Sequence, residues 1–173
     1  APWNKLYRLD IIKENNIIFP EGYRHHDLAF TQHYLLSCKK VVYIVKALNH
    51  YLKDRPNNIS TSYDNKIGHI IIMLDYIIKK YKDYGLYDNN YEELKFLAIS
   101  NLIVSLRKIS NISSSTFVKS YISEVFSWLD KEFVDYKNSS YFGICSKHDI
   151  IYKQPWTTKL YYYYSRLKKK IDR

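Results

Sequence analysis

Residues 67–81, IGHIIIMLDYIIKKY, decide the fold that the sequence predicts. Their apolar side chains recur at spacings of three and four residues, which is the period of one face of an α-helix. The members of that face are Ile67, Ile70, Ile71, Leu74, Ile77, Ile78 and Tyr81. Gly85 follows, and glycine commonly ends a helix because it tolerates the left-handed conformation found there. We therefore predict an amphipathic helix that ends near Gly85.

The same spacing predicts two further helices between residues 91 and 136. The first has an apolar face formed by Tyr91, Leu94, Ala98, Leu102, Leu106 and Ile109. The second has an apolar face formed by Phe117, Tyr121, Val125, Leu129, Phe133 and Tyr136. The stretch Ser110–Ser115 separates the two faces, and its serine hydroxyls can accept hydrogen bonds from the free amides at the start of a helix.

A fourth helix is predicted from about Thr158 to Ile171. Its apolar positions, which we expect to pack inward, are Leu160, Tyr164, Leu167 and Ile171. Its basic positions, which we expect to face solvent, are Arg166, Lys168, Lys169 and Lys170. The adjacent run Tyr161–Tyr164 leaves a second interpretation open, because aromatic and basic side chains together suit an anionic membrane surface. With its three predecessors, this helix predicts a small bundle over residues 64–173.

In residues 1–63 the pattern of apolar and turn-forming residues changes about every ten residues, as expected of a mixed α/β segment. Two short helices are predicted, at Leu9–Glu14 and at about His26–Ser37. The run Lys40–Lys46 (KVVYIVK) is apolar, β-branched and too short for a helix, so it predicts a strand, which Asn49–Leu52 would extend after a kink. Because one or two strands do not make an independent sheet, we expect this segment to belong to a larger sheet.

The composition limits the classes of partner. The 173 residues include 27 Lys and Arg against 17 Asp and Glu, a formal net charge of +10. That excess suits nucleic acid, anionic lipid or sugar phosphates, and it equally suits an AT-biased genome. Cys38 and Cys145 have no CxxC neighbour, so neither a disulfide framework nor a zinc site is indicated. No apolar run approaches the roughly 20 residues that cross a bilayer. We expect a cytoplasmic protein, with the inner face of the membrane as a further location.

Three short words in the first thirty residues carry the functional prediction. They are Pro2–Tyr7 (PWNKLY), Asn16–Pro20 (NIIFP) and Arg24–Phe30 (RHHDLAF). In this order and spacing they resemble the acceptor-side segment of family 2 glycosyltransferases, bacterial enzymes with a GT-A fold that build capsular and cell-wall polysaccharides from nucleotide-sugars. In that family a helix begins with an acidic pair, usually Glu-Asp, followed by Phe at a fixed distance. Asp27 and Phe30 match this pattern, and His26 replaces the usual Glu.

Asp27 is the candidate catalytic residue. An inverting glycosyl transfer needs a carboxylate base aimed at the acceptor hydroxyl. Asp27 lies at the start of a predicted helix, where the free amides and the helix dipole favour the ionised carboxylate. Position alone favours the simpler interpretation, a stabilising Asp at a helix N-terminus. The resemblance decides between the two, because the matching Asp is the base in that family.

The resemblance also implies substrate-binding residues. Trp3 would form an aromatic wall under a sugar ring, and Lys5 would reach the diphosphate or orient the acceptor. The alternative is a buried Trp that anchors the chain and an ordinary surface Lys. His26 takes the place of a conserved acidic partner, and Arg55 matches an arginine that contacts the diphosphate. His50 could approach the metal, although a lone His on a strand is more often a packed residue.

The donor half of such an enzyme contains an Asp-x-Asp word that binds a divalent ion, Mg or Mn, and this chain has none. The nearest sequence is Asp130-Lys131-Glu132, which we reject because residues two apart on a helix point to nearly opposite faces. Since the chain opens at Ala1 directly with a motif, we expect a further domain upstream that supplies the metal ligands. The chain alone is expected to be inactive.

The sequence therefore predicts a mainly α fold in two domains. Residues 1–63 would be a remnant of a GT-A α/β domain with one or two strands and two short helices, and residues 64–173 a helical bundle. The predicted function is part of a glycosyltransferase that uses a nucleotide-sugar donor and a glycan acceptor to make a surface or capsular glycan. The alternative is a basic helical module that binds a membrane surface, nucleic acid or a partner synthase, or that self-associates. Without a helix-turn-helix or an RNP word, nucleic acid is disfavoured.

Overall fold

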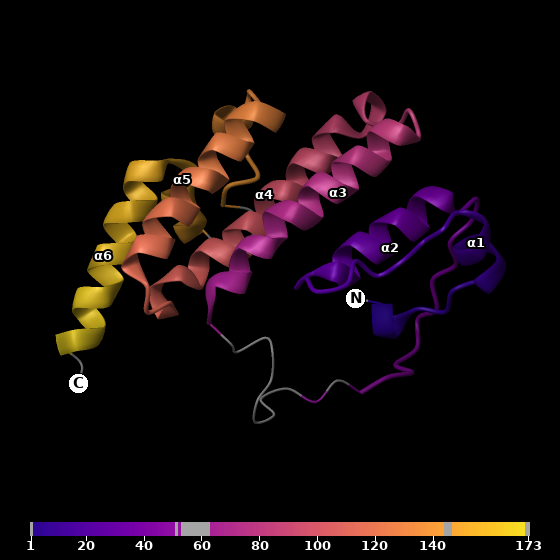
Figure 1. Ribbon diagram of the computed structural model, residues 1–173, viewed down its shortest axis with the longest axis horizontal. Helices are drawn as coiled ribbons and strands as arrows, with labels where there is room; N and C mark the ends of the chain where they lie inside the picture. The colour runs from indigo at the N-terminus through magenta and orange to yellow at the C-terminus, as the bar shows by residue number, and fades with distance from the viewer. Residues whose placement is uncertain (1, 51, 53–62, 144–146, 172–173) are drawn as a thin grey trace. The chain divides into compact units, whose positions relative to one another are not determined.

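The computed structural model describes residues 2–50, 52, 63–143 and 147–171. The described residues form α-helices, short 3-10 turns and irregular segments (Figure 1), so the mainly α prediction is confirmed. The α-helices are α1 (Leu9–Glu14), α2 (His26–Ser37), α3 (His69–Asp83), α4 (Tyr91–Arg107), α5 (Ser115–Glu132) and α6 (Pro155–Ile171). The 3-10 turns are η1 (Pro2–Asn4), η3 (Asn65–Gly68), η4 (Asp88–Asn90), η5 (Ile109–Asn111), η6 (Tyr136–Asn138) and η7 (Lys147–Lys153). None of these helices is both long and apolar enough to cross a membrane.

The described chain divides into two compact units. The first unit holds η1, α1 and α2 together with residues 72–87, and the second holds residues 63–71 and everything from residue 88 onward. Helix α3 therefore begins in the second unit and ends in the first. It ends as predicted, because Gly85 adopts a left-handed φ of 67° and the amide of Leu86 donates to the carbonyl of Tyr81 at 2.9 Å. The predicted domain boundary between residues 63 and 64 stays a prediction.

The predicted strand at Lys40–Lys46 is wrong, and so is its extension at Asn49–Leu52 as far as that stretch is described. The five apolar side chains of Val41–Val45 are all exposed, from 58% for Ile44 to 88% for Val45. A strand takes its backbone hydrogen bonds from a neighbouring strand, and the described part of the chain offers no such neighbour. High β-propensity alone did not produce a strand here, because that propensity reflects packing on a sheet.

The first unit is built around one face of α2. Its core is Phe30, Tyr34 and Ile17, against which Tyr7, Ile11, Ile12 and Cys38 pack. The bounds of α1 and α2 agree with those predicted from the sequence. On α2, Phe30, Thr31 and Tyr34 are buried, whereas Leu28 and Leu35 are only partly covered, as is Cys38 just after the helix. The aromatic residues rather than the leucines therefore anchor this helix.

The other side of α2 is fastened to α3 by tyrosine hydroxyls within the same unit. His33 Nδ1 and Tyr76 Oη are 3.0 Å apart, and Tyr81 Oη donates to Gln32 Oε1 at 3.3 Å. Tyr84 Oη lies 3.0 Å from Ser37 Oγ. His33 is only 2% exposed, and its burial lowers the pKa of the imidazole, with the charge of Lys80 adding to the effect and Asp83 opposing it. The α2–α3 contact therefore favours the neutral form of this histidine.

The second unit has its core along α4 and α5. Its buried side chains include Leu94, Ala98, Ile99, Leu102, Leu106, Val118, Tyr121, Ile122, Val125 and Leu129. Tyr121 Oη lies 2.6 Å from Ser105 Oγ, so a buried phenol of α5 is paired with α4. Ser114 caps α5 by accepting a hydrogen bond from the amide of Phe117 at 3.2 Å, as predicted for the serine-rich stretch.

Helix α6 packs on α5, η5 and η7 with a different face from the predicted one. Leu160, Tyr164 and Leu167, predicted to point inward, are 61–63% exposed. Thr158 and Tyr162 are buried instead. The Thr158 hydroxyl donates to the carbonyls of Gln154 and Ile151 at 2.9 and 3.2 Å, so this polar side chain is satisfied inside. The side chain of Ile171 lies outside the described part of the chain.

An ion pair between a buried carboxylate and an exposed guanidinium ties η7, and with it the start of α6, to α4. Asp149 is buried, and both of its carboxylate oxygens accept from the guanidinium of Arg107 at 2.5–2.9 Å. This is the bidentate geometry that makes an Arg–carboxylate pair strong. Removal of Arg107 would leave a buried carboxylate without its compensating charge.

We predict that Arg107→Met lowers the free energy of unfolding by about 2–4 kcal/mol, because it strands the Asp149 carboxylate. Urea unfolding followed by circular dichroism measures this. The control is Lys137→Met, which breaks the exposed pair with Asp130 and should cost much less. Equal losses in the two variants would contradict the role given to Arg107.

We predict that the first unit loses stability as the pH falls from about 7.5 to 5.5. The folded pKa of His33 lies below its unfolded value of about 6.5, so the unfolded chain takes up the proton first. The stability that His33 contributes is thus present above the unfolded pKa and is lost as the pH falls toward the folded one. His33→Gln should flatten this part of the profile of unfolding free energy against pH. His50→Gln, at an exposed histidine, should keep the wild-type slope, and an unflattened His33→Gln profile would refute the assignment.

Candidate functional site

Asp27 lies in the first turn of α2, as predicted, and is partly buried. The loop before it reverses through Gly22 and His25, which adopt left-handed φ values of 80° and 65°. Such a φ is unusual for a residue other than glycine, and His25 is the N-cap of the helix. The loop brings Phe19 back onto the beginning of α2.

The three sequence words meet around Phe30. Phe19, from the second word, stacks on Phe30 with ring centroids 3.9 Å apart and planes inclined by 4°. Tyr7, from the first word, meets the same ring edge-on at 5.2 Å and also packs against Tyr34 at 4.7 Å. Phe30 belongs to the third word, together with Asp27. Segments that are separate in sequence therefore converge on the turn of α2 that follows the candidate base.

Two buried hydroxyl oxygens lie in this cluster, Tyr7 Oη and Thr31 Oγ1. Among the described residues, neither has a hydrogen-bond partner of acceptable geometry. Thr31 follows Asp27 by four residues on α2 and shares its face. Burial raises the pKa of the Tyr7 phenol, the nearby Thr31 hydroxyl lowers it, and Tyr34 and Asp27 raise it further. The Tyr7 and Thr31 hydroxyls therefore lie close together, and the Asp27 carboxylate, one turn before Thr31 on α2, is near enough for its charge to act on the Tyr7 phenol.

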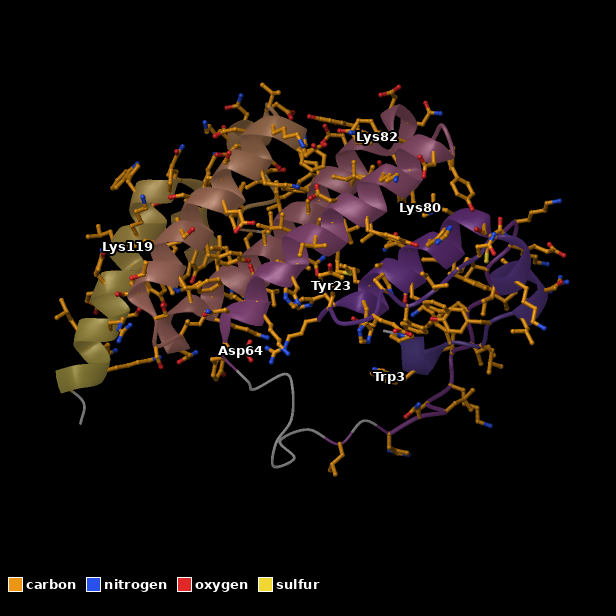
Figure 2. All side chains as sticks on the ribbon, in the orientation of Figure 1. Trp3, Tyr23, Asp64, Lys80, Lys82 and Lys119 are labelled. Atoms are coloured by element: carbon orange, nitrogen blue, oxygen red, sulfur yellow. The ribbon has the colours of Figure 1, made fainter. Side chains whose placement is uncertain are left out.

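Trp3 and Lys5 lie in the same unit, on or next to the turn η1, which contacts α2. Trp3 is 49% exposed, and its backbone carbonyl accepts a hydrogen bond from Asn49 Nδ2 at 3.1 Å. Lys5 is exposed and donates to Asn4 Oδ1 at 2.8 Å. Figure 2 labels Trp3 on η1 and Tyr23 in the loop that leads into α2. The structure thus places both predicted binding residues on a segment that packs on the helix of Asp27.

His26 is oriented by its surroundings. Its Nδ1 lies 2.8 Å from the carbonyl of Tyr23 and is therefore the protonated nitrogen, since a carbonyl only accepts. Phe19 meets the His26 ring edge-on at 5.7 Å. The predicted contact Arg55 lies outside the described residues. His50 is described and exposed.

The described part of the chain contains no group of three His, Cys, Asp or Glu side chains that could hold a metal ion. The rejected Asp130 and Glu132 pair instead with Lys137 and Lys131, at 2.8 and 3.0 Å. Asp130 and Glu132 therefore do not fit a divalent-ion site. The expectation that the metal ligands lie upstream stays untested.

Sequence reasoning missed Tyr7, Phe19 and Thr31 as members of the site. All three lie inside or next to the quoted words, and Thr31 could have been found from its four-residue spacing after Asp27. The spacing of residues along the sequence does not predict that the Tyr7 and Thr31 hydroxyls are buried together. Their burial depends on how η1 and α1 fold back onto α2.

Comparisons with known proteins add no relative: no protein-family model matches the chain, and no curated protein or solved structure is detectably similar to it.

Proposed function

We propose that this chain is the acceptor-side part of a nucleotide-sugar-dependent glycosyltransferase with a GT-A domain, and that Asp27 is its catalytic base. The observation that carries the proposal is the meeting of the three words around Phe30, next to Asp27. A shared site requires its segments to lie together, and these three segments do. The product would be a surface or capsular glycan.

In this mechanism the Asp27 carboxylate takes the proton of an acceptor hydroxyl while that oxygen attacks the anomeric carbon of the donor. A carbon–oxygen bond to the acceptor forms as the bond to the nucleoside diphosphate breaks, and the diphosphate leaves with the electron pair. Attack from the opposite side inverts the anomeric configuration. Lys5 and Arg55 supply positive charge for the diphosphate, and the exposed face of Trp3 supports a sugar ring.

Tyr7 and Thr31 are proposed as positioning residues for Asp27. Both hydroxyls are buried and lack a hydrogen-bond partner of good geometry among the described residues. Thr31 lies one turn after Asp27 on α2, and the charge of Asp27 raises the pKa of the Tyr7 phenol. In the proposal, the two hydroxyls donate to the Asp27 carboxylate once the acceptor is bound, and so aim it at the acceptor hydroxyl.

We predict that Asp27→Asn lowers turnover by a factor on the order of 100 or more with little change in donor binding, because an amide cannot accept the proton. The measurement is nucleoside diphosphate release from a panel of UDP- and GDP-sugars by the full-length protein, with oligosaccharides of cell-surface glycans as acceptors. Glu14→Gln, which removes an exposed carboxylate of α1, is the matched control and should turn over like the wild type. Equal turnover of Asp27→Asn and Glu14→Gln would rule out the base role.

We predict that Thr31→Val lowers kcat about tenfold with little change in KM for the acceptor, because the Asp27 carboxylate loses a hydroxyl that aims it. Thr31→Ser keeps the hydroxyl and should restore kcat. The valine variant should be at least as stable as the wild type, since it removes a buried hydroxyl that lacks a well-formed hydrogen bond. An unchanged kcat in a stable valine variant would show that Thr31 only packs.

A further inference from the structure

Helix α6 carries a second apolar face that the helical bundle does not cover. We call it the α6 outer face, and its exposed members are Trp156, Leu160, Tyr163, Tyr164 and Leu167. At 3.6 residues per turn, these positions fall within an arc of roughly 100°. Trp156, Leu160, Tyr164 and Leu167 are each more than 60% exposed. A continuous stripe of this kind differs from singly scattered surface residues and indicates a binding surface.

The opposite side of α6 is fixed to the rest of the second unit, so the helix cannot turn its outer face inward. Tyr162 is buried, and its hydroxyl accepts a hydrogen bond from Arg166 Nη1 at 2.9 Å. The same guanidinium donates to the carbonyl of Ser113 at 3.2 Å. Lys169 Nζ donates to the carbonyl of Ser110 at 3.3 Å. The contacts of α6 thus hold the apolar stripe toward the outside.

The charges of α6 are of one sign. Pro155–Ile171 contains no acidic residue and carries Lys159, Arg166, Lys168, Lys169 and Lys170. By helical position, Lys159 and Lys168 fall about 40° beyond the two edges of the stripe, one on each side. Lys119 of α5, labelled in Figure 2, adds a cation 6.0 Å from the ring of Tyr163. An apolar stripe with a lysine on each side and aromatic residues within it is the pattern of a helix that lies in a membrane interface.

We propose that the α6 outer face seats this protein on the surface of an anionic lipid bilayer. The apolar stripe would enter the boundary between headgroups and acyl chains, and the flanking lysines would contact lipid phosphates. The proposal does not rest on the glycosyltransferase assignment, because every residue in it belongs to the second unit.

Two other occupants fit the observed charges less well. A second copy of the same face would bring two clusters of like charge together, which costs free energy. Single-stranded nucleic acid would need a basic groove along its backbone with aromatic rings for its bases. Here leucines interrupt the aromatic rings, and Arg166 and Lys169 are engaged with the protein itself. An anionic bilayer matches both the apolar centre and the basic edges.

The test is sedimentation of the chain with vesicles of phosphatidylcholine alone or with 30% phosphatidylglycerol, at low and at physiological salt. We expect the wild type to partition at least tenfold more strongly onto the anionic vesicles, and less so as salt rises. Trp156→Ser with Leu160→Ser, and separately Lys159→Glu with Lys168→Glu, should each lower the partition coefficient by about tenfold or more. All four positions lie outside the buried core, so the thermal unfolding of both variants should stay that of the wild type.

Matched control variants test whether binding requires the α6 outer face or only the overall charge and hydrophobicity of the protein. Val104→Ser with Val134→Ser removes exposed apolar side chains from elsewhere in the second unit, and Lys39→Glu with Lys40→Glu makes the same change in net charge in the first unit. Both should bind anionic vesicles within about twofold of the wild type. The proposal is overturned if the wild type does not bind anionic vesicles, or if controls and α6 variants lose binding equally. It is also overturned if light scattering shows a dimer that the stripe variant abolishes, or if the lysine variant loses oligonucleotide binding while vesicle binding persists.

Discussion

The first unit depends on the aromatic contacts of Phe30. This buried ring receives Phe19 face to face and Tyr7 edge-on, and it shares a core with Tyr34 and Ile17. These contacts hold the segment of Tyr7 and the loop of Phe19 against α2. They bring the buried Tyr7 and Thr31 hydroxyls onto the helix that carries Asp27, so one packing constraint serves both the local fold and the candidate site.

In the second unit, polar contacts determine which face of α6 is buried. The bidentate pair of Arg107 and Asp149 holds η7 against α4, and η7 in turn supplies the carbonyl of Ile151, which accepts a hydrogen bond from the Thr158 hydroxyl. Once Thr158 and Tyr162 are taken into the interior, the leucines of α6 can only face outward. An apolar stripe thus becomes available for a partner although the helix is firmly attached. If both proposals hold, an enzyme that builds a surface glycan would also be kept at the membrane.

The sequence predicted the helices well, because their apolar periods and their ends are local properties. Leu9–Glu14 and His26–Ser37 were placed correctly, and Gly85 and Ser114 end and cap their helices as expected. The wrong predictions concern tertiary contacts. A strand at Lys40–Lys46 would need a neighbouring strand to pair with. The apolar period of α6 defines a stripe, but it does not show whether the helical bundle buries that stripe. In the candidate site, Asp27 was predicted from the short sequence motifs. The burial of the Tyr7 and Thr31 hydroxyls could not be predicted in this way, because it depends on tertiary packing.

The central claim is that Asp27 is the base that deprotonates an acceptor hydroxyl. It is tested most directly by a crystal structure of the full-length protein with a non-transferable nucleotide-sugar analogue and a bound acceptor oligosaccharide. The account predicts one acceptor hydroxyl at hydrogen-bond distance from an Asp27 oxygen, about 2.6–3.2 Å, and in line with the anomeric carbon of the donor. An acceptor held elsewhere, with a different carboxylate against its reactive hydroxyl, would contradict the account.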